Sequence, residues 1–279
     1  MKRFPLVLLP LLLAGCVSAP PPTDSFRVLV YNIHAGKDAA GEPNLERVAE
    51  LIASTDAYLV LLQEVDRNTT RSGGVDQLAE LEQLTGLHGT FGKSLDYQGG
   101  EYGLAILSRW PIAAADVVPL PNDPPQPRAG GAREPRIALF AVTNGIRVMN
   151  THLDASGEET YRLQEIAHLL AAAETSEPLL VGGDFNAEPS SAVYSQASAR
   201  GLRDSWTECG AGSALTFPAA APVKRIDYLF LAADARCSSA RVLETTASDH
   251  RPLLVTVERP LPEPERPLQR GRGQGRRGM

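Results

Sequence analysis

Two polar side chains follow an apolar run and a pair of glycines in the second half of the chain. The run 179–181 has the composition of a buried strand and leads through Gly182 and Gly183 to Asp184 and Asn186. Side chains two residues apart in a strand point to the same face, so we expect Asp184 and Asn186 to aim at one spot. The pattern indicates a strand that delivers chemistry at its end, with an ordinary Asx-type turn as the alternative.

A second carboxylate, Glu64, directly follows the short apolar run 57–62. A charge placed after a buried strand is costly unless it is paired or bound to a cation. Glu64 is therefore the first candidate for a metal ligand. Asn32 ends another β-rich run, 26–32, and offers a hard oxygen of the kind that Mg²⁺ takes.

Further acidic and imidazole side chains lie at the ends of other predicted strands. His152 follows a predicted hairpin, Asp227 lies near the start of a strand, and Asp249 and His250 precede the last strand. A single polar group of this kind is a weak signal. Strand ends that all carry an acid, an amide or an imidazole form a constellation, which favours an active site.

The elements that must position these residues alternate between helix and strand. Helical spacing and capping residues predict helices over 44–54, 76–85, 158–173 and 191–199. Runs of β-forming residues predict strands over 26–32, 57–62, 101–108, 136–143, 146–150, 179–181, 225–231 and 253–257. The Pro-, Gly- and Ala-rich segment 119–133 is predicted to be a long loop that borders the substrate cleft.

The two ends of the chain differ from this domain in composition. A basic start and an apolar run too short to span a membrane predict a secretory signal over 1–15. The sequence Leu-Ala-Gly-Cys resembles the bacterial lipoprotein processing box, with lipid on Cys16; an ordinary cleaved signal is the alternative. We expect a Pro-rich tether over 16–25, one domain over 26–258 and a disordered Arg/Gly/Pro tail over 259–279.

These ends also determine the expected location. With Val17 rather than an Asp after the cysteine, the lipoprotein pattern predicts the outer membrane of the bacterial cell envelope. The chain has 27 basic and 33 acidic residues; the predicted signal removes two basic residues, and the tail holds six Arg and two Glu, so the body carries about −12. A domain with this net negative charge is not expected to attract nucleic acid, although a bound metal ion would change the local electrostatic field. The tail is either attracted to nucleic acid or anionic lipid, or simply solvated.

Cysteine is sparse. If Cys16 carries lipid, Cys209 and Cys237 remain, in a compartment that permits disulfides. They are expected either to pair or to stay as two buried thiols.

Six short motifs occur in one order along the domain: Tyr-Asn-Ile-His, Gln-Glu-Val-Asp, Asn-Thr-His-Leu, Gly-Asp-Phe-Asn, Arg-Ile-Asp-Tyr and Ser-Asp-His-Arg-Pro. Together they resemble the endonuclease/exonuclease/phosphatase superfamily, which contains DNase I, abasic-site endonucleases, inositol polyphosphate 5-phosphatases and bacterial sphingomyelinases. The resemblance covers nearly all of 26–258. It implies a DNase I-like four-layer α/β sandwich, in which two packed mixed β-sheets are flanked by helices, and a Mg²⁺-dependent phosphoesterase site, with Mn²⁺ or Ca²⁺ as alternative ions.

The resemblance also implies roles for the residues around the metal. Asn32, Glu64 and Asp249 match positions of the metal environment. Asp184 matches the carboxylate that orients or deprotonates the attacking water, and Asn186 would help to hold that water or a phosphate oxygen.

Two histidines match positions that act on the phosphate. His250 resembles the imidazole that contacts the scissile phosphate, and Asp227 resembles its carboxylate partner. His152 matches the second histidine of the DNase and sphingomyelinase branches, with Glu101 as its expected partner. Predicted phosphate-side contacts are Glu101, Tyr102, Arg136, Arg225, His34 and Arg109. His88 and His168 are predicted to be structural.

The expected activity is that of an exported nuclease or general phosphodiesterase, attached to the membrane through its lipid and with no protein partner implied. A phospholipid or sphingomyelin phosphodiesterase is the alternative, although the sequence shows no long aromatic hairpin for membrane insertion. A non-catalytic surface-binding module on the same fold is the alternative from another class.

Overall fold

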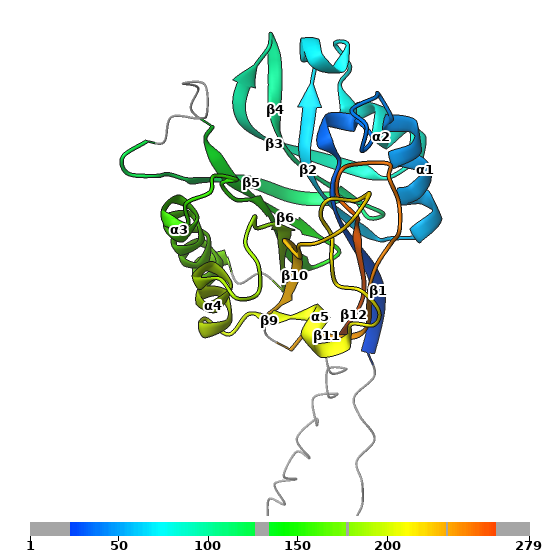
Figure 1. The fold of residues 1–279 in the computed structure, drawn as a ribbon. Coiled ribbons are helices and arrows are strands. Elements are labelled where there is room, and N and C mark those ends of the chain that lie inside the picture. Colours follow the sequence, from blue (N-terminus) through cyan, green and yellow to red (C-terminus); the bar gives the residue numbers. More distant parts are fainter. Residues whose placement is uncertain (1–22, 126–133, 177–178, 233, 261–279) are drawn as a thin grey trace, which may run out of the picture.

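The computed structural model describes residues 23–125, 134–176, 179–232 and 234–260. The predicted signal peptide, Cys16 and nearly all of the predicted tail lie outside these residues. In the described part, no helix is long and apolar enough to cross a membrane. Two six-stranded sheets pack face to face and helices cover their outer surfaces, so the predicted four-layer α/β sandwich is confirmed (Figure 1).

The first sheet contains both ends of the described chain. Its strand order is β11-β12-β1-β2-β4-β3, with β1 and β2 parallel and the other neighbours antiparallel. The strands are β1 (Thr23–Asn32), β2 (Leu59–Arg67), β3 (His88–Tyr97), β4 (Gly100–Ser108), β11 (Arg236–Val242) and β12 (Leu253–Pro260).

The second sheet has the order β5-β6-β7-β8-β10-β9, with β7 and β8 parallel and the other neighbours antiparallel. Its strands are β5 (Ile112–Leu120), β6 (Arg136–Thr143), β7 (Ile146–His152), β8 (Leu180–Asp184), β9 (Arg203–Asp204) and β10 (Asp227–Leu231). The β6–β7 hairpin turns at Asn144 and Gly145, both with positive φ, as the Asn-Gly pair predicts.

Helices cover the outer face of each sheet. On the first sheet lie α1 (Leu45–Thr55) and α2 (Gln77–Thr85); on the second lie α3 (Thr160–Ser176) and α4 (Ala192–Ala199) (Figure 1). All four match the predicted helices within three residues at each end. Shorter elements are α5 (Ser205–Cys209) and the 3-10 turns η1 (His34–Gly36) and η2 (Thr70–Ser72).

The central strands of the sandwich are apolar on both faces, one facing the other sheet and one facing the helices. In β1, Val28 and Val30 pack between the sheets, whereas Leu29 and Tyr31 pack under the helices. A strand that is buried on both sides has no polar face, which is why the central strands appear in the sequence as continuous apolar runs.

Several strands were not predicted, because their sequences lack that signal. β3 contains two glycines and is half exposed, and β5 is an exposed edge strand of mostly Ala, Asp and Val. β5 includes Pro119 and Leu120, so the predicted loop 119–133 starts later than expected, and its part from 126 to 133 lies outside the described residues. β1 begins at Thr23, before the predicted boundary at 26, because it pairs with β12 as far as Pro260.

Cys209 and Cys237 form a disulfide between α5 and β11. Of the two alternatives left open by the sequence, pairing is the one the structure shows.

Candidate active site

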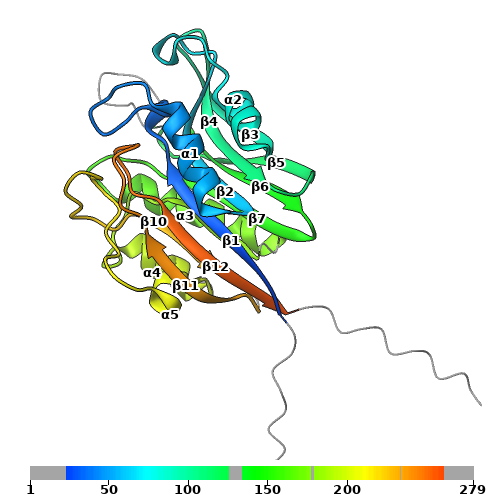
Figure 2. The same cartoon turned by 90° about the vertical axis from the view of Figure 1, so that its right-hand side faces the viewer.

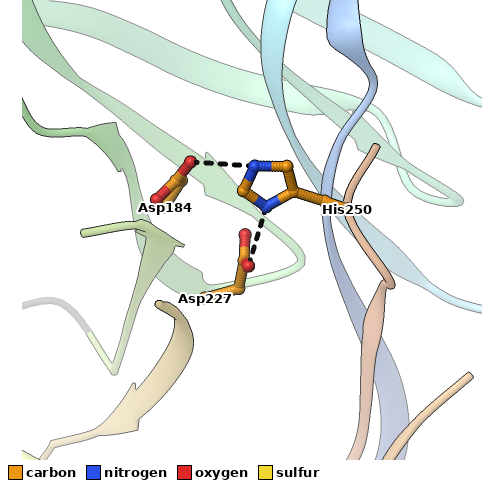
Figure 3. Close-up of side chains that lie close together, drawn as sticks. All are labelled: Asp184, Asp227 and His250. Atoms are coloured by element: carbon orange, nitrogen blue, oxygen red, sulfur yellow. Dashed lines mark hydrogen bonds and ion pairs between the residues drawn. The ribbon is translucent and has the colours of Figure 1, made fainter. Parts of the chain in front are cut away.

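A buried histidine lies between two buried carboxylates at the centre of the polar cluster. His250 Nδ1 is 2.9 Å from Asp227 Oδ2, and His250 Nε2 is 3.6 Å from Asp184 Oδ2 (Figure 3). Asp184 and Asp227 are paired in register on β8 and β10, so their side chains leave the sheet on the same side. His250 comes from the loop before β12, in the other sheet. The cluster therefore forms where the two sheets meet.

The charged groups of this cluster shift one another's pKa values. Burial lowers the pKa of the His250 imidazole, but the carboxylates of Asp227 and Asp184 outweigh burial and raise that pKa to about 10. His250 is thus an imidazolium at neutral pH. Burial and then the Asp227 charge raise the pKa of Asp184, while His250 opposes this. Perturbed acid–base groups in one cleft are typical of catalytic sites.

His152 and Asn186 close the other side of Asp184. Asn186 donates its backbone N–H to Asp184 Oδ1 at 2.9 Å, and its Nδ2 lies 3.0 Å from His152 Nε2. His152 Nε2 is also 3.5 Å from Asp184 Oδ2. The backbone of Asn186 is left-handed, with a φ of 47°. The Asx-type turn and the convergence of Asp184 and Asn186 on one spot were given as alternatives, and both occur. The turn itself directs the two side chains inward.

Glu64 is delivered by a β-bulge and not by a strand end. The bulge lies between Leu62 and Val65, and Glu64 has a φ of 57°. A left-handed backbone costs a non-glycine residue about 1–3 kcal/mol, and such strain is concentrated at functional sites. β2 does not stop at Leu62 as predicted but continues to Arg67, because pairing with β4 resumes after the bulge.

Asn32 connects Glu64 to the cluster around Asp184. Its Nδ2 lies 3.2 Å from Glu64 Oε1 and 3.1 Å from Asp184 Oδ2. Within the described residues, this is the only hydrogen bond of the Glu64 carboxylate, which leaves oxygen lone pairs for a cation. Asn32 Oδ1 accepts the His34 N–H at 3.0 Å, so ligation through that oxygen would require the amide to turn. The donor chemistry of Glu64 and Asn32 fits a hard divalent cation.

Three further acids of the cluster, Asp249, Asp184 and Asp227, carry oxygens that could bind a cation. Asp249 is partly exposed and lies 3.8 Å from His34 Nδ1, and no described contact joins it to Glu64. Asp184, Asp227 and His250 also have ligand atoms within 4.8 Å of one another. Both ring nitrogens of His250 already face carboxylates, however, so Glu64 and Asn32 have the donor oxygens less engaged by the cluster.

The cluster opens on two hollows. One is lined by Glu64, Arg71, Leu95, Tyr97 and Tyr102. The other adjoins the histidine side, where its lining includes Ser156, Arg162, Asn186, Phe217, Lys224 and His250. Space is therefore open on both sides of the Asp184 cluster.

The expected partnership between Glu101 and His152 is wrong. Glu101 Oε2 lies 3.3 Å from Arg67 Nη1, and Glu101 Oε1 lies 3.5 Å from Lys93 Nζ. Neighbouring residues of β4 point to opposite faces, so Glu101 stays on the partly exposed side while Tyr102 is buried. Tyr102 lines the hollow beside Glu64, where burial and then the Glu64 charge raise its pKa.

Arg136 and Arg225, which the sequence suggested as substrate contacts, are engaged in buried ion pairs. Arg136 Nη1 lies 3.1 Å from Glu134 Oε1, and Arg225 Nη2 pairs with Asp204 Oδ2. Buried charges require such partners, which explains both arginines without a substrate. Arg109 follows β4 at the end of the sandwich remote from the cluster and pairs with Asp56 at the surface. His88 and His168 are exposed on β3 and α3.

Sequence reasoning missed Glu165, which lies on the buried face of α3. Glu165 Oε2 accepts the Asp154 N–H at 2.7 Å, and Oε1 accepts Asn122 Nδ2 at 2.9 Å. Burial raises the pKa of Glu165 to about 7. Glu165 thereby ties down the loop that follows His152. Its place beside Ile166 and Leu169 on an apolar helix face was the available signal.

Comparison with known proteins agrees with the motifs. The model of the endonuclease/exonuclease/phosphatase family matches residues 29–250. YbhP of Escherichia coli (strain K12), an uncharacterized protein, is 30% identical over 247 residues, which are 84% of this chain and 96% of that protein. An endonuclease/exonuclease/phosphatase structure from Beutenbergia cavernae has a TM-score of 0.73 at 22% identity, covering 84% of this chain and 71% of that one.

A mannosyl-6-phosphatase structure from Bacteroides thetaiotaomicron has a TM-score of 0.68 at 20% identity, covering 83% of this chain and 99% of that one. These solved structures share the fold, and the family model spans most of the chain. The protein therefore belongs to the endonuclease/exonuclease/phosphatase family of phosphoester hydrolases.

Proposed function

We propose that the protein is a Mg²⁺-dependent phosphodiesterase that uses direct attack of water. The observation that carries this proposal is the convergence on Asp184, whose carboxylate lies 2.9 Å from Asn186 N, 3.1 Å from Asn32 Nδ2, 3.5 Å from His152 Nε2 and 3.6 Å from His250 Nε2. A buried carboxylate with a raised pKa is a competent base for one water molecule.

Each residue of the cluster has a task in this reaction. Asp184 takes the proton of the attacking water, and Asn186 orients that water. His250, kept protonated by Asp227, donates from Nε2 to a phosphoryl oxygen as negative charge develops there. His152 faces the same carboxylate, and once protonated and released from the Asn186 amide its Nε2 would donate a proton to the leaving oxygen. A divalent cation on Glu64 and Asn32 would supply Lewis-acid stabilisation of the phosphoryl group.

The two hollows favour a diester over a monoester substrate, because each offers space for one ester group. The histidine-side hollow carries Arg162 and Lys224 together with Glu159 and Glu188, and the hollow beside Glu64 carries Arg71, which pairs with the buried Asp66. The exposed ammonium of Lys224 suits a phosphate of a nucleic acid or of another polyanionic diester. We therefore propose an exported nuclease or general phosphodiesterase, anchored to the cell envelope by lipid on Cys16.

The test is hydrolysis of bis-p-nitrophenyl phosphate, plasmid DNA, RNA and sphingomyelin, with Mg²⁺ and with EDTA. Asp184→Ala is compared with Asp116→Ala, which removes an exposed carboxylate of β5. We expect Mg²⁺-dependent cleavage that Asp184→Ala abolishes and Asp116→Ala retains. Cleavage by Asp184→Ala at the wild-type rate would overturn the proposal. Inertness on every substrate, together with no metal binding in calorimetry, would favour the binding module.

A further inference from the structure

The chain enters and leaves the sandwich at the end opposite the active site. β1 and β12 run antiparallel, with Thr23 paired to Pro260 and Val30 paired to Leu253 (Figure 2). Asn32 ends β1, and His250 lies just before β12 begins. Both site residues therefore lie a full strand length away from the point where the chain joins its two terminal segments.

The length of β1 can be compared with the length of the predicted tether. From Thr23 to Asn32 the strand spans about 30 Å, at about 3.3 Å per residue. Cys16, the predicted lipid-bearing residue, precedes Thr23 by seven residues, which span at most about 25 Å even when fully extended. If the site faced the lipid surface, Thr23 would lie at the far end of the sandwich, about 30 Å above that surface. The tether is too short for this.

Basic side chains gather at the same remote end. Arg27 is near the start of β1, Arg109 follows β4, Arg147 is near the start of β7, and Arg236 begins β11. Arg27 and Arg109 share the single carboxylate of Asp56. The segment after Pro260 adds five Arg and two Glu. Asp234 and Glu258, the latter paired in register with Arg236, lie at this end too, so the surplus of positive charge there comes largely from the arginines of the segment after Pro260, and that surplus suits an anionic surface.

We infer that this basic end, which comprises Thr23, Arg27, Arg109, Arg147 and Arg236, rests on the anionic phospholipid membrane that holds the anchor, and that the active site opens away from it. The inference rests on the proposed lipid on Cys16. Combined with the proposed activity, it means that the enzyme cleaves phosphodiesters in solution or on another surface. The lipids of its own leaflet are out of reach.

The orientation of the protein on the membrane can be measured without an activity assay. The lipidated full chain is placed in phosphatidylethanolamine/phosphatidylglycerol vesicles with a fluorophore on Ser25→Cys, at the basic end, or on Glu158→Cys, in the loop after His152. Both positions are exposed, and the native cysteines are engaged by lipid and by the disulfide. We expect an acceptor dye in the membrane to quench the Ser25→Cys label roughly twofold more than the Glu158→Cys label, given a separation on the order of a strand length. Equal or reversed quenching overturns the inference.

Two variants of this measurement test its causes. A flexible insertion of roughly 20 residues between Pro22 and Thr23 should reduce the difference in quenching, because it removes the limit on reach. Neutral phosphatidylcholine vesicles should also reduce it. An unchanged difference with the insertion overturns the tether argument, and an unchanged difference on neutral lipid overturns the charge argument.

Hydrolysis assays provide the last test of this orientation. Anchored enzyme should cleave dissolved bis-p-nitrophenyl phosphate at the rate of unanchored enzyme, and should not cleave phosphodiester lipids of its own vesicle. If the anchored enzyme cleaved the lipids of its own vesicle as fast as the unanchored enzyme does, the inference would be overturned. Inertness toward dissolved substrate as well would refute the proposed activity, while the quenching result would still decide the orientation.

Discussion

His250 Nδ1 lies 2.9 Å from Asp227 Oδ2, although His250 precedes a strand of the first sheet and Asp227 begins a strand of the second. The contact exists only when the two sheets are packed together. It places the proton of Nδ1 toward Asp227 and turns Nε2 toward Asp184. The orientation of the imidazole is thus a property of the sandwich as a whole.

Replacing Asp227 by Asn should move the alkaline limb of the pH–rate profile to lower pH. In the wild type the raised His250 pKa means that the stabilising ion pair is complete below about pH 6.5 and is lost as pH rises through about 10. Without the carboxylate charge, burial lowers the pKa and the imidazolium is lost earlier. We expect kcat at pH 8 to fall roughly 10²–10⁴-fold. Rates measured from pH 6 to 10 test this, with Asp116→Asn as the control; an unmoved alkaline limb would contradict it.

Replacing Glu64 by Gln should weaken metal binding at least roughly tenfold, because it removes the charged oxygen donor of the proposed site. Glu101→Gln is the matched control, since Glu101 pairs with Arg67 and Lys93. Calorimetric titration of both variants with Mg²⁺ and Mn²⁺ measures the affinities. Equal losses in the two variants would show that the assignment of Glu64 is incorrect.

Gly183→Ala should destabilise the fold and abolish activity. Gly183 has a φ of 141°, and a Cβ there would lie 1.9 Å from the Thr151 carbonyl oxygen on β7. Relief requires β7 and β8 to separate next to His152 and Asp184, at a cost of about 2–4 kcal/mol in the free energy of unfolding. Gly157→Ala, with open space around its Cβ, should unfold like the wild type. Urea unfolding followed by circular dichroism compares the three proteins.

Removing the Cys209–Cys237 disulfide should lower the free energy of unfolding by about 3–4 kcal/mol, from the chain entropy of a loop with a sequence separation of 28. The double variant Cys209→Ser, Cys237→Ser should retain activity under native conditions, since the bond joins α5 and β11 away from Asp184. Chemical unfolding with and without reductant gives the difference. A wild type that unfolds at the same denaturant concentration in both conditions would argue against the bond.

The local signals of the sequence were sufficient for most of the fold and for most of the candidate residues that the structure brings together around Asp184. Apolar runs, helical spacing and the Asn-Gly turn depend on near neighbours in the chain, so the central strands and four helices were predictable. The exposed β3 and β5 lack a buried face, and their sequences therefore lack a strand pattern.

By itself, the sequence predicted the candidate site residues: the carboxylates, amides and histidines that follow apolar runs, in the order typical of one family. The tertiary structure alone decided their partners. Glu101 pairs with Arg67 instead of His152, Arg225 pairs with Asp204, and Glu64 is aimed by a bulge. The physical reason is that a side-chain contact depends on strand register and sheet packing, which bring together residues far apart in the chain.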